Sequence, residues 1–179
     1  LRADMCGVYG RGNYVPTPNI DALARQGVRF TRGTATCPLC TPYRGMMLTG
    51  RYPTHSGVIL NFTDANPVQN PNTLAVVLKN AGYDTAFIGK WHLSAGRLRT
   101  AGLFEPDFEK IQAYADSDDG IEFTPPGPDR LGFDTWFAYN FHCNFNNYWY
   151  YGDEPVKQQT DRYETDVQID QAIAFMKQR

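Results

Sequence analysis

Residues 73–92 read TLAVVLKNAGYDTAFIGKWH, and this stretch joins a helical pattern to a strand pattern. Apolar residues spaced i, i+3 and i+4 predict a helix over residues 73–80 that stops at Gly82. Residues 83–88 predict a strand, and a Gly-Lys-Trp-His segment follows it. Helix, short link, strand and loop are typical of an α/β fold with a mostly parallel sheet flanked by helices. Such sheets carry their chemistry at the carboxyl ends of the strands. The spaced apolar residues are Leu74, Val77 and Leu78.

Further patterns flank this unit on both sides. They predict helices over residues 18–26, near 40–50 and over 160–179, and a short strand over 28–31. Residues 61–73 contain prolines and small polar residues and predict a loop. The side chains expected to share an apolar helix face are Ile20, Leu23 and Ala24, then Met46, Met47 and Leu48, and finally Val167, Ile173 and Met176.

The composition is that of an ordinary globular chain. Of the 179 residues, 42% are hydrophobic and 20% are charged, and the net charge is −2. No basic patch indicates nucleic-acid binding, and no apolar run approaches the roughly 20 residues that cross a bilayer. Residues 96–128 are rich in Asp, Gly and Pro and predict an irregular insertion. The chain does not begin with Met and ends within a helical pattern, so we expect a fragment truncated at both ends.

The strongest chemical signal is CTPYR at residues 40–44, followed by LTGR at 48–51. A cysteine at a helix N-terminus is exposed to the helix dipole and to amide donors. Arg44 lies one turn after Cys40, so its guanidinium can reach back to the same site, and Pro42 stiffens the first turn. The pattern predicts a cationic corner around one sulfur, suited to an anionic substrate. On spacing alone, a buried cysteine beside a surface arginine remains the alternative.

The flanking motifs identify a resemblance. CTPYR with TGR downstream resembles the first signature of the sulfatase family, and GYDTAFIGKWHL at residues 82–93 is similar to its second. The two occur in the family's order, about forty residues apart. TPNID at 17–21, GVRF at 27–30, GFD at 132–134 and YETD at 163–166 fit the family as well. The resemblance implies that residues 1–179 are a partial catalytic domain, the N-terminal portion of an alkaline-phosphatase-like fold that lacks the first strand and the C-terminal part.

The resemblance also implies a mechanism. Sulfatases hydrolyse sulfate esters with a formylglycine that a separate maturation enzyme, the formylglycine-generating enzyme, makes from the signature cysteine, here Cys40. The hydrated aldehyde attacks sulfur and expels the alcohol, and its second hydroxyl then drives elimination of sulfate. This covalent route divides one hard step into two easier ones.

Roles follow for four further residues. Arg44 would hold the hydrated aldehyde, and Lys90 would neutralise the sulfate oxygens as charge develops. His92, with an ordinary pKa near 6.5, would deprotonate the hydroxyl that drives sulfate elimination. His142 is a candidate substrate contact, with a structural histidine as the alternative, and the aromatic residues 141–151 favour core packing over sugar stacking.

The resemblance implies one hard divalent cation, calcium or else magnesium, bound by oxygen ligands. Within this chain only the formylglycine from Cys40 would contact it, and the other ligands would lie outside, so the fragment alone would be inactive. The substrate would be a sulfated small molecule or glycan. The resemblance to the family implies a location in the periplasm, outside the cell or in the lysosome. Tyr43 stands where serine is usual, which puts the efficiency of maturation in question.

Two other functions are kept as alternatives. A phosphate or phosphonate ester hydrolase of the same superfamily would share the fold. A redox or metal-binding module could instead use the Cys37-x-x-Cys40 pair, although the other two cysteines, Cys6 and Cys143, do not complete a zinc pattern. Asn61-Phe62-Thr63 also matches the N-glycosylation motif.

Overall fold

The computed structural model describes residues 2–10, 15–66, 68–94, 123–142 and 144–178. Most of the insertion predicted at 96–128 therefore lies outside the described residues. The chain divides into two compact units, Leu1–Ala35 and Thr36–Arg179. No helix among the described residues is long and apolar enough to cross a membrane.

Side-chain hydrogen bonds to one helix hold the first unit together. Asp21 on this helix accepts hydrogen bonds from the Val8 backbone N–H and the Thr17 hydroxyl, both at 3.0 Å. Thr17 occupies the N-cap position but makes no side-chain cap; its hydroxyl instead accepts from the Gly7 N–H at 3.0 Å. The helix has the predicted bounds because proline begins it and glycine follows it. The elements of this unit are η1 (Ala3–Met5), η2 (Gly7–Tyr9) and α1 (Pro18–Gln26).

The strand predicted over residues 28–31 is wrong, because these residues form no strand. Val28 and Phe30 are among the most exposed apolar side chains, at 81% and 77%. A strand needs a neighbouring strand for its backbone hydrogen bonds, and no strand among the described residues pairs with residues 28–31. The predicted apolar face of α1 does gather on one side, where Ile20, Leu23 and Ala24 line a cavity of about 370 Å³.

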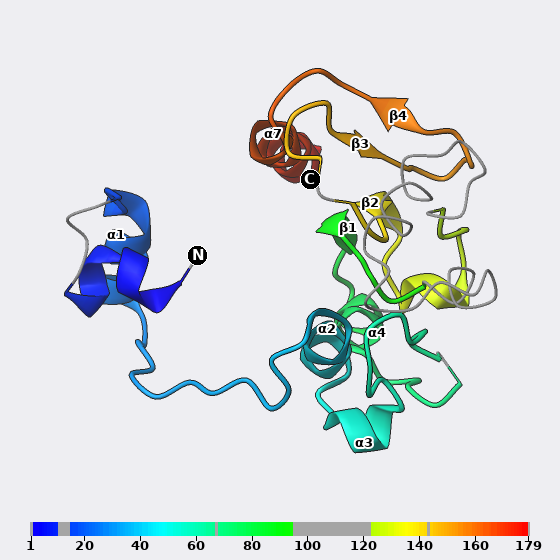
Figure 1. Cartoon of the computed structure of the whole chain (residues 1–179), viewed down its shortest axis with the longest axis horizontal. Coiled ribbons are helices and arrows are strands. Elements are labelled where there is room, and N and C mark those ends of the chain that lie inside the picture. Colours follow the sequence, from blue (N-terminus) through cyan, green and yellow to red (C-terminus); the bar gives the residue numbers. More distant parts are fainter. Residues whose placement is uncertain (1, 11–14, 67, 95–122, 143, 179) are drawn as a thin grey trace. The chain divides into compact units, whose positions relative to one another are not determined.

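A parallel strand pair is the centre of the second unit. β1 (Ala86–Lys90) and β2 (Thr135–Tyr139) lie side by side in Figure 1, with Ala86 opposite Thr135 and Lys90 opposite Tyr139. α7 packs against β1, and α2 packs against α3 and α4. Parallel strands flanked by helices confirm the predicted α/β class. The remaining elements are α2 (Cys40–Thr49), α3 (Pro53–Ser56), α4 (Leu74–Asn80), η3 (Pro128–Arg130), β3 (Trp149–Tyr150), antiparallel β4 (Gln158–Gln159) and α7 (Glu164–Lys177).

β1 begins and ends later in the chain than predicted. Residues 83–85 form the link, in which Thr85 O accepts hydrogen bonds from the N–H groups of Asp134 and Thr135. The ladder starts only where β2 provides a partner, at Ala86. Lys90 is therefore the last residue of the strand and His92 lies two residues beyond it, at the carboxyl end, as the α/β pattern predicts.

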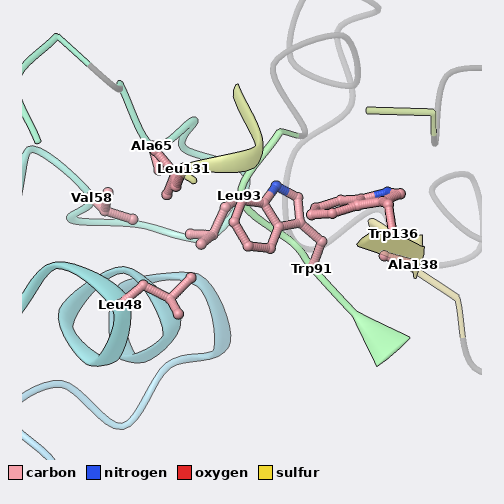
Figure 2. Close-up of a cluster of buried hydrophobic side chains, with 8 residues drawn as sticks. All are labelled: Leu48, Val58, Ala65, Trp91, Leu93, Leu131, Trp136 and Ala138. Atoms are coloured by element: carbon pink, nitrogen blue, oxygen red, sulfur yellow. The ribbon is translucent and has the colours of Figure 1, made fainter. Parts of the chain in front are cut away.

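The hydrophobic core joins α2 to the segment after β1. In Figure 2 the Trp91 indole lies between Leu93 and Trp136, with Leu48 of α2 nearby. Trp91 is fully buried, and its indole N–H donates to the Ser94 hydroxyl at 2.9 Å. Burying side chains of this size stabilises the fold by about 1.5–3 kcal/mol each, so the residues flanking His92 are firmly anchored. The core residues are Leu48, Val58, Ala65, Trp91, Leu93, Leu131, Trp136 and Ala138.

A second, aromatic cluster lies between β2, β3 and α7, and it confirms core packing for Tyr148, Trp149 and Tyr151, whereas Phe145 is exposed. Tyr139 donates its phenolic hydrogen bond to the buried Glu164 carboxylate at 2.5 Å, which ties the end of β2 to the start of α7. Burial, with Glu164 adding to it, raises the pKa of Tyr139. The cluster contains Tyr139, Tyr148, Trp149, Tyr151 and Val167.

Several side chains predicted to face inward are exposed instead. Of the three α7 side chains predicted to face inward only Val167 is buried, and in α2 Leu48 is buried whereas Met47 is half exposed. A helix face is covered only where another element packs on it, and the part of the chain that the structure describes leaves these faces open. The exposed set is Met47, Leu74, Val77, Leu78, Ile173 and Met176, together with Ile20 and Leu23 in the first unit.

Gly132 is expected to be intolerant of any side chain. Its φ is +97°, and a Cβ would lie 2.7 Å from the Val76 backbone nitrogen in the first turn of α4. Because backbone cannot yield as a flexible side chain can, Gly132→Ala should lower the free energy of unfolding by about 2–4 kcal/mol. Gly82→Ala is the matched control, since its φ is +87° but nothing lies within 4 Å, and it should cost about 1–2 kcal/mol. Equal shifts of the urea midpoint would contradict the close approach to α4.

Candidate active site

Cys40 is the first residue of α2 and its side chain is exposed. The residue before it, Leu39, has extended backbone and cannot cap the helix with its side chain. The Thr41 N–H at this end instead donates to Asn61 Oδ1 at 3.0 Å. The three cysteines that the structure describes, Cys6, Cys37 and Cys40, are not in disulfides. Residue 40 is thus reachable from solution at a helix N-terminus, where backbone amides favour anions.

Arg44 connects α2 to the end of β1. Its Nη1 donates to the Lys90 carbonyl oxygen at 2.5 Å, a contact between residues 46 positions apart. Burial lowers the pKa of the Arg44 guanidinium, and the nearby Tyr139 and Cys40 act in the opposite direction. An arginine keeps its charge in proteins, so a positive charge lies near residue 40. That Arg44 reaches back one turn to residue 40 stays a prediction.

Lys90 and His92 both pack against aromatic side chains. The Lys90 ammonium lies 4.5 Å from the centre of the Phe141 ring. The His92 ring is buried between Phe62, at 4.9 Å between ring centres, and Phe141, at 5.1 Å. Neither His92 nitrogen has a hydrogen-bond partner among the described residues. The structure therefore brings Cys40, Arg44, Lys90 and His92 into one neighbourhood, linked through Arg44.

The pKa of His92 is lowered from 6.5 to about 2, mainly by burial and then by the positive charges of Lys90 and Arg44. The imidazole is therefore neutral near pH 7, as a proton acceptor must be. Its backbone φ of +58° is unusual for a residue with a side chain, and such backbone strain often occurs at functional sites.

This buried imidazole predicts a loss of stability in acid. Between pH 6.5 and about 2 the unfolded chain binds a proton at His92 that the folded chain does not. The free energy of unfolding should therefore fall as the pH falls through that window, by at most about 1.4 kcal/mol per pH unit for this one group. His92→Gln should remove this component from urea unfolding curves recorded between pH 7 and pH 5. The exposed His55 provides the control, because His55→Gln should keep the slope. An unchanged slope in His92→Gln would contradict the buried neutral state.

His142 packs within the aromatic cluster, against Tyr139, Tyr148 and Trp149. Its Nε2 donates to the Trp149 carbonyl oxygen at 3.2 Å, and its Nδ1 accepts from the Asn144 N–H at 3.1 Å. Its ring centre is 3.6 Å from that of Tyr139. Both nitrogens are thus engaged by backbone, which favours the structural alternative; a substrate contact by His142 stays a prediction.

Sequence reasoning did not assign Asn61, Phe62 or Phe141 to this neighbourhood. Asn61 and Phe62 were visible only as part of a glycosylation motif, and Phe141 only among the aromatic residues expected to pack in the core. Each contacts the site through a residue at least 20 positions away in the sequence. No local spacing encodes such contacts.

The predicted cation is not matched by a ligand set in the described residues. No three His, Cys, Asp or Glu side chains there lie close enough together to bind a metal ion. A hard cation prefers oxygen ligands, so residue 40 would bind it as the hydrated aldehyde and not as the thiol.

Comparison with known proteins places the chain in a family. The sulfatase family profile matches residues 1–179. An ulvan-active sulfatase of Formosa agariphila is 31% identical over 92% of this chain, and an endo-4-O-sulfatase of Bacteroides thetaiotaomicron is 35% identical over 78%. The chain belongs to the sulfatase family. It spans 28% and 27% of the lengths of these two relatives.

Solved structures agree with this placement. The structure of yidJ from Bacteroides fragilis, described as a sulfatase, superposes with a TM-score of 0.77 at 28% identity, covering 98% of this chain and 38% of that one. A protein in complex with its substrate D-glucosamine-2-N,6-O-disulfate gives a TM-score of 0.70 at 28% identity, over 98% of this chain and 29% of that one. The fold is alkaline-phosphatase-like, as predicted.

Proposed function

We propose that the protein containing this chain hydrolyses sulfate esters through a formylglycine made from Cys40. The observation that carries the proposal is the hydrogen bond from Arg44 to the Lys90 carbonyl oxygen, because it joins the nucleophile helix to the strand end that bears Lys90 and His92. The family assignment supports the same activity.

The charges around residue 40 suit a sulfate ester. A helix N-terminus, the Arg44 guanidinium and the Lys90 ammonium are all positive, and the ester is an anion. The formylglycine would supply an oxygen nucleophile and the second hydroxyl that releases sulfate. Arg44 orients that residue, Lys90 draws charge from the sulfate oxygens, and neutral His92 accepts a proton. An anion bound next to Lys90 and Arg44 would oppose the effect of their positive charges on His92 and so raise the pKa of His92.

We further propose that the ester is a sulfated carbohydrate. An ulvan-active sulfatase, an endo-4-O-sulfatase and a complex with a disulfated glucosamine are all among the proteins similar to this chain. A calcium or magnesium ion would contact residue 40, with its remaining ligands outside this chain. A formylglycine-generating enzyme would carry out maturation, and an extracytoplasmic location would suit such a substrate.

Two measurements on the full-length protein, produced with a formylglycine-generating enzyme, test the proposal. Trypsin should release residues 33–44, a peptide that holds both Cys37 and Cys40. Fragment ions should place the thiol-to-aldehyde mass loss at Cys40 and leave Cys37 unchanged. Paired assays should then show turnover of aryl sulfate well above that of aryl phosphate. Faster turnover of the phosphate would favour the phosphate or phosphonate hydrolase alternative, and conversion at Cys37 would contradict the assigned nucleophile.

A further inference from the structure

The loop between α3 and α4 supplies two consecutive side chains that reach different parts of the candidate site. Asn61 is half buried, and its Oδ1 accepts from the Thr41 N–H at 3.0 Å, beside residue 40. The helix has no capping side chain of its own, since Leu39 occupies that position. A residue distant in sequence thus supplies the acceptor that Ser, Asp or Asn usually provides from the N-cap. The position of residue 40 depends on this bond.

Phe62 contacts the other half of the site. Its side chain is only 4% exposed, and its ring meets the His92 ring at 4.9 Å and 65°, edge to face. The same ring lies 5.6 Å from that of Phe141, which also packs on His92. Since His92 has no hydrogen-bond partner among the described residues, packing against these two rings helps to fix its orientation.

The backbone of this segment is strained. Phe62 has a φ of +59°, a left-handed conformation that a bulky residue rarely adopts. Such a conformation persists only where surrounding contacts require it. A relaxed backbone at residue 62 would turn the ring away from His92 or withdraw Asn61 from Thr41, because adjacent residues share one peptide plane.

We infer that Asn61 and Phe62 are positioning residues, which hold residue 40 and His92 in a fixed relation to each other. The inference rests on the proposed function. It gives Asn61 of the Asn61-Phe62-Thr63 motif a role within the fold, since its Oδ1 accepts a hydrogen bond from the nucleophile helix.

The first test uses full-length matured protein with three variants at position 61 or nearby. Turnover is normalised to formylglycine content, so that incomplete maturation does not lower it. Asn61→Ala should lower kcat roughly 10- to 100-fold with a small change in KM, because displacement of a nucleophile by about 1 Å can cost that much. Asn66→Ala is the matched control: this exposed asparagine accepts from Val68 N–H at 2.8 Å in the same loop, and its loss should leave kcat unchanged.

A conservative variant separates positioning from folding. Asn61→Asp keeps the acceptor for Thr41 N–H, so kcat should return to within about threefold of the unmutated value. Its added negative charge should raise KM for the anionic ester roughly tenfold. A kcat equal to the unmutated value in Asn61→Ala, or an unchanged KM in Asn61→Asp, would overturn the role of Asn61. Should Asn61→Ala not fold, Asn61→Asp decides alone.

The role of Phe62 has its own pair of variants. Phe62→Leu keeps an apolar side chain but removes the ring edge, and kcat per formylglycine should fall roughly 5- to 50-fold. Phe145→Leu, at an exposed phenylalanine, should not change it. An unchanged kcat in Phe62→Leu would overturn the inference for this residue. Absence of sulfate-ester turnover in the unmutated protein would refute the proposed function itself, which is a different result from turnover that ignores these substitutions.

Discussion

Sulfate-ester turnover should fall by about 10⁴-fold or more when Cys40 is replaced by alanine in the full-length protein, since loss of a covalent nucleophile leaves only binding and electrostatic stabilisation. Cys40 is exposed at the first position of α2, so its removal should change the free energy of unfolding little. A large loss of activity without a loss of stability is the expected signature.

The matched control is Cys37, the other cysteine of the Cys-x-x-Cys pair, which is partly exposed and not in a disulfide. Cys37→Ser should retain turnover within about twofold if residue 40 alone carries the chemistry. A redox or metal-binding module built on the pair predicts the opposite, equal damage from both substitutions. Turnover by Cys40→Ala at the unmutated rate would refute the assigned nucleophile.

Cys40→Ser refines the same prediction. Serine provides one hydroxyl where the hydrated aldehyde has two, so the enzyme could be sulfated once but could not release sulfate by the proposed route. The expected result is no steady turnover, with a sulfated peptide over residues 33–44 detectable by mass spectrometry after exposure to an aryl sulfate. Sustained turnover by Cys40→Ser would show that the second hydroxyl is not needed.

Local signals predicted the ends of α1 and of α2, the helix that carries the candidate nucleophile. Proline and glycine fixed the ends of α1, and Gly50, with φ of +66°, ends α2 where the pattern placed it. Both signals act through backbone conformation within one turn, so they need no knowledge of the rest of the fold. The start of β1 was missed because a strand begins where its partner begins, and β2 lies 49 residues further on.

The site was predictable only in part for the same physical reason. Cys40 and Arg44 share one helical turn, and Lys90 and His92 share one strand end, so spacing sufficed within each pair. What joins the pairs is long-range: the Arg44 bond to Lys90, the Asn61 cap and the two phenylalanines around His92. Apolar helix faces were also overpredicted, because amphipathic spacing indicates a face and does not say what covers it.

Arg44 is expected to be the most sensitive position after Cys40, because it is the contact through which the two pairs meet. Arg44→Ala removes a charge facing residue 40 and a bond to the Lys90 carbonyl, and should lower kcat/KM by about 10³-fold per converted formylglycine. Formylglycine conversion should fall as well, since arginine belongs to the Cys-x-Pro-x-Arg motif. Normalising to conversion keeps the two effects apart.

Charge and geometry can be separated with lysine at the same position. Arg44→Lys keeps the positive charge but loses the planar fork that reaches the Lys90 carbonyl while facing residue 40, so activity should recover only partly, to within about 10- to 100-fold of the unmutated value. Arg51→Ala is the matched control, because Arg51 also donates to a backbone carbonyl, that of Gln69 at 2.6 Å, from an exposed place just beyond α2. It should affect stability more than kcat/KM. Full recovery of activity in Arg44→Lys would mean that the charge alone matters. Equal losses of kcat/KM from Arg44→Ala and Arg51→Ala would mean that Arg44 only supports the fold. The link between residue 40 and the end of β1 would then have no part in the chemistry.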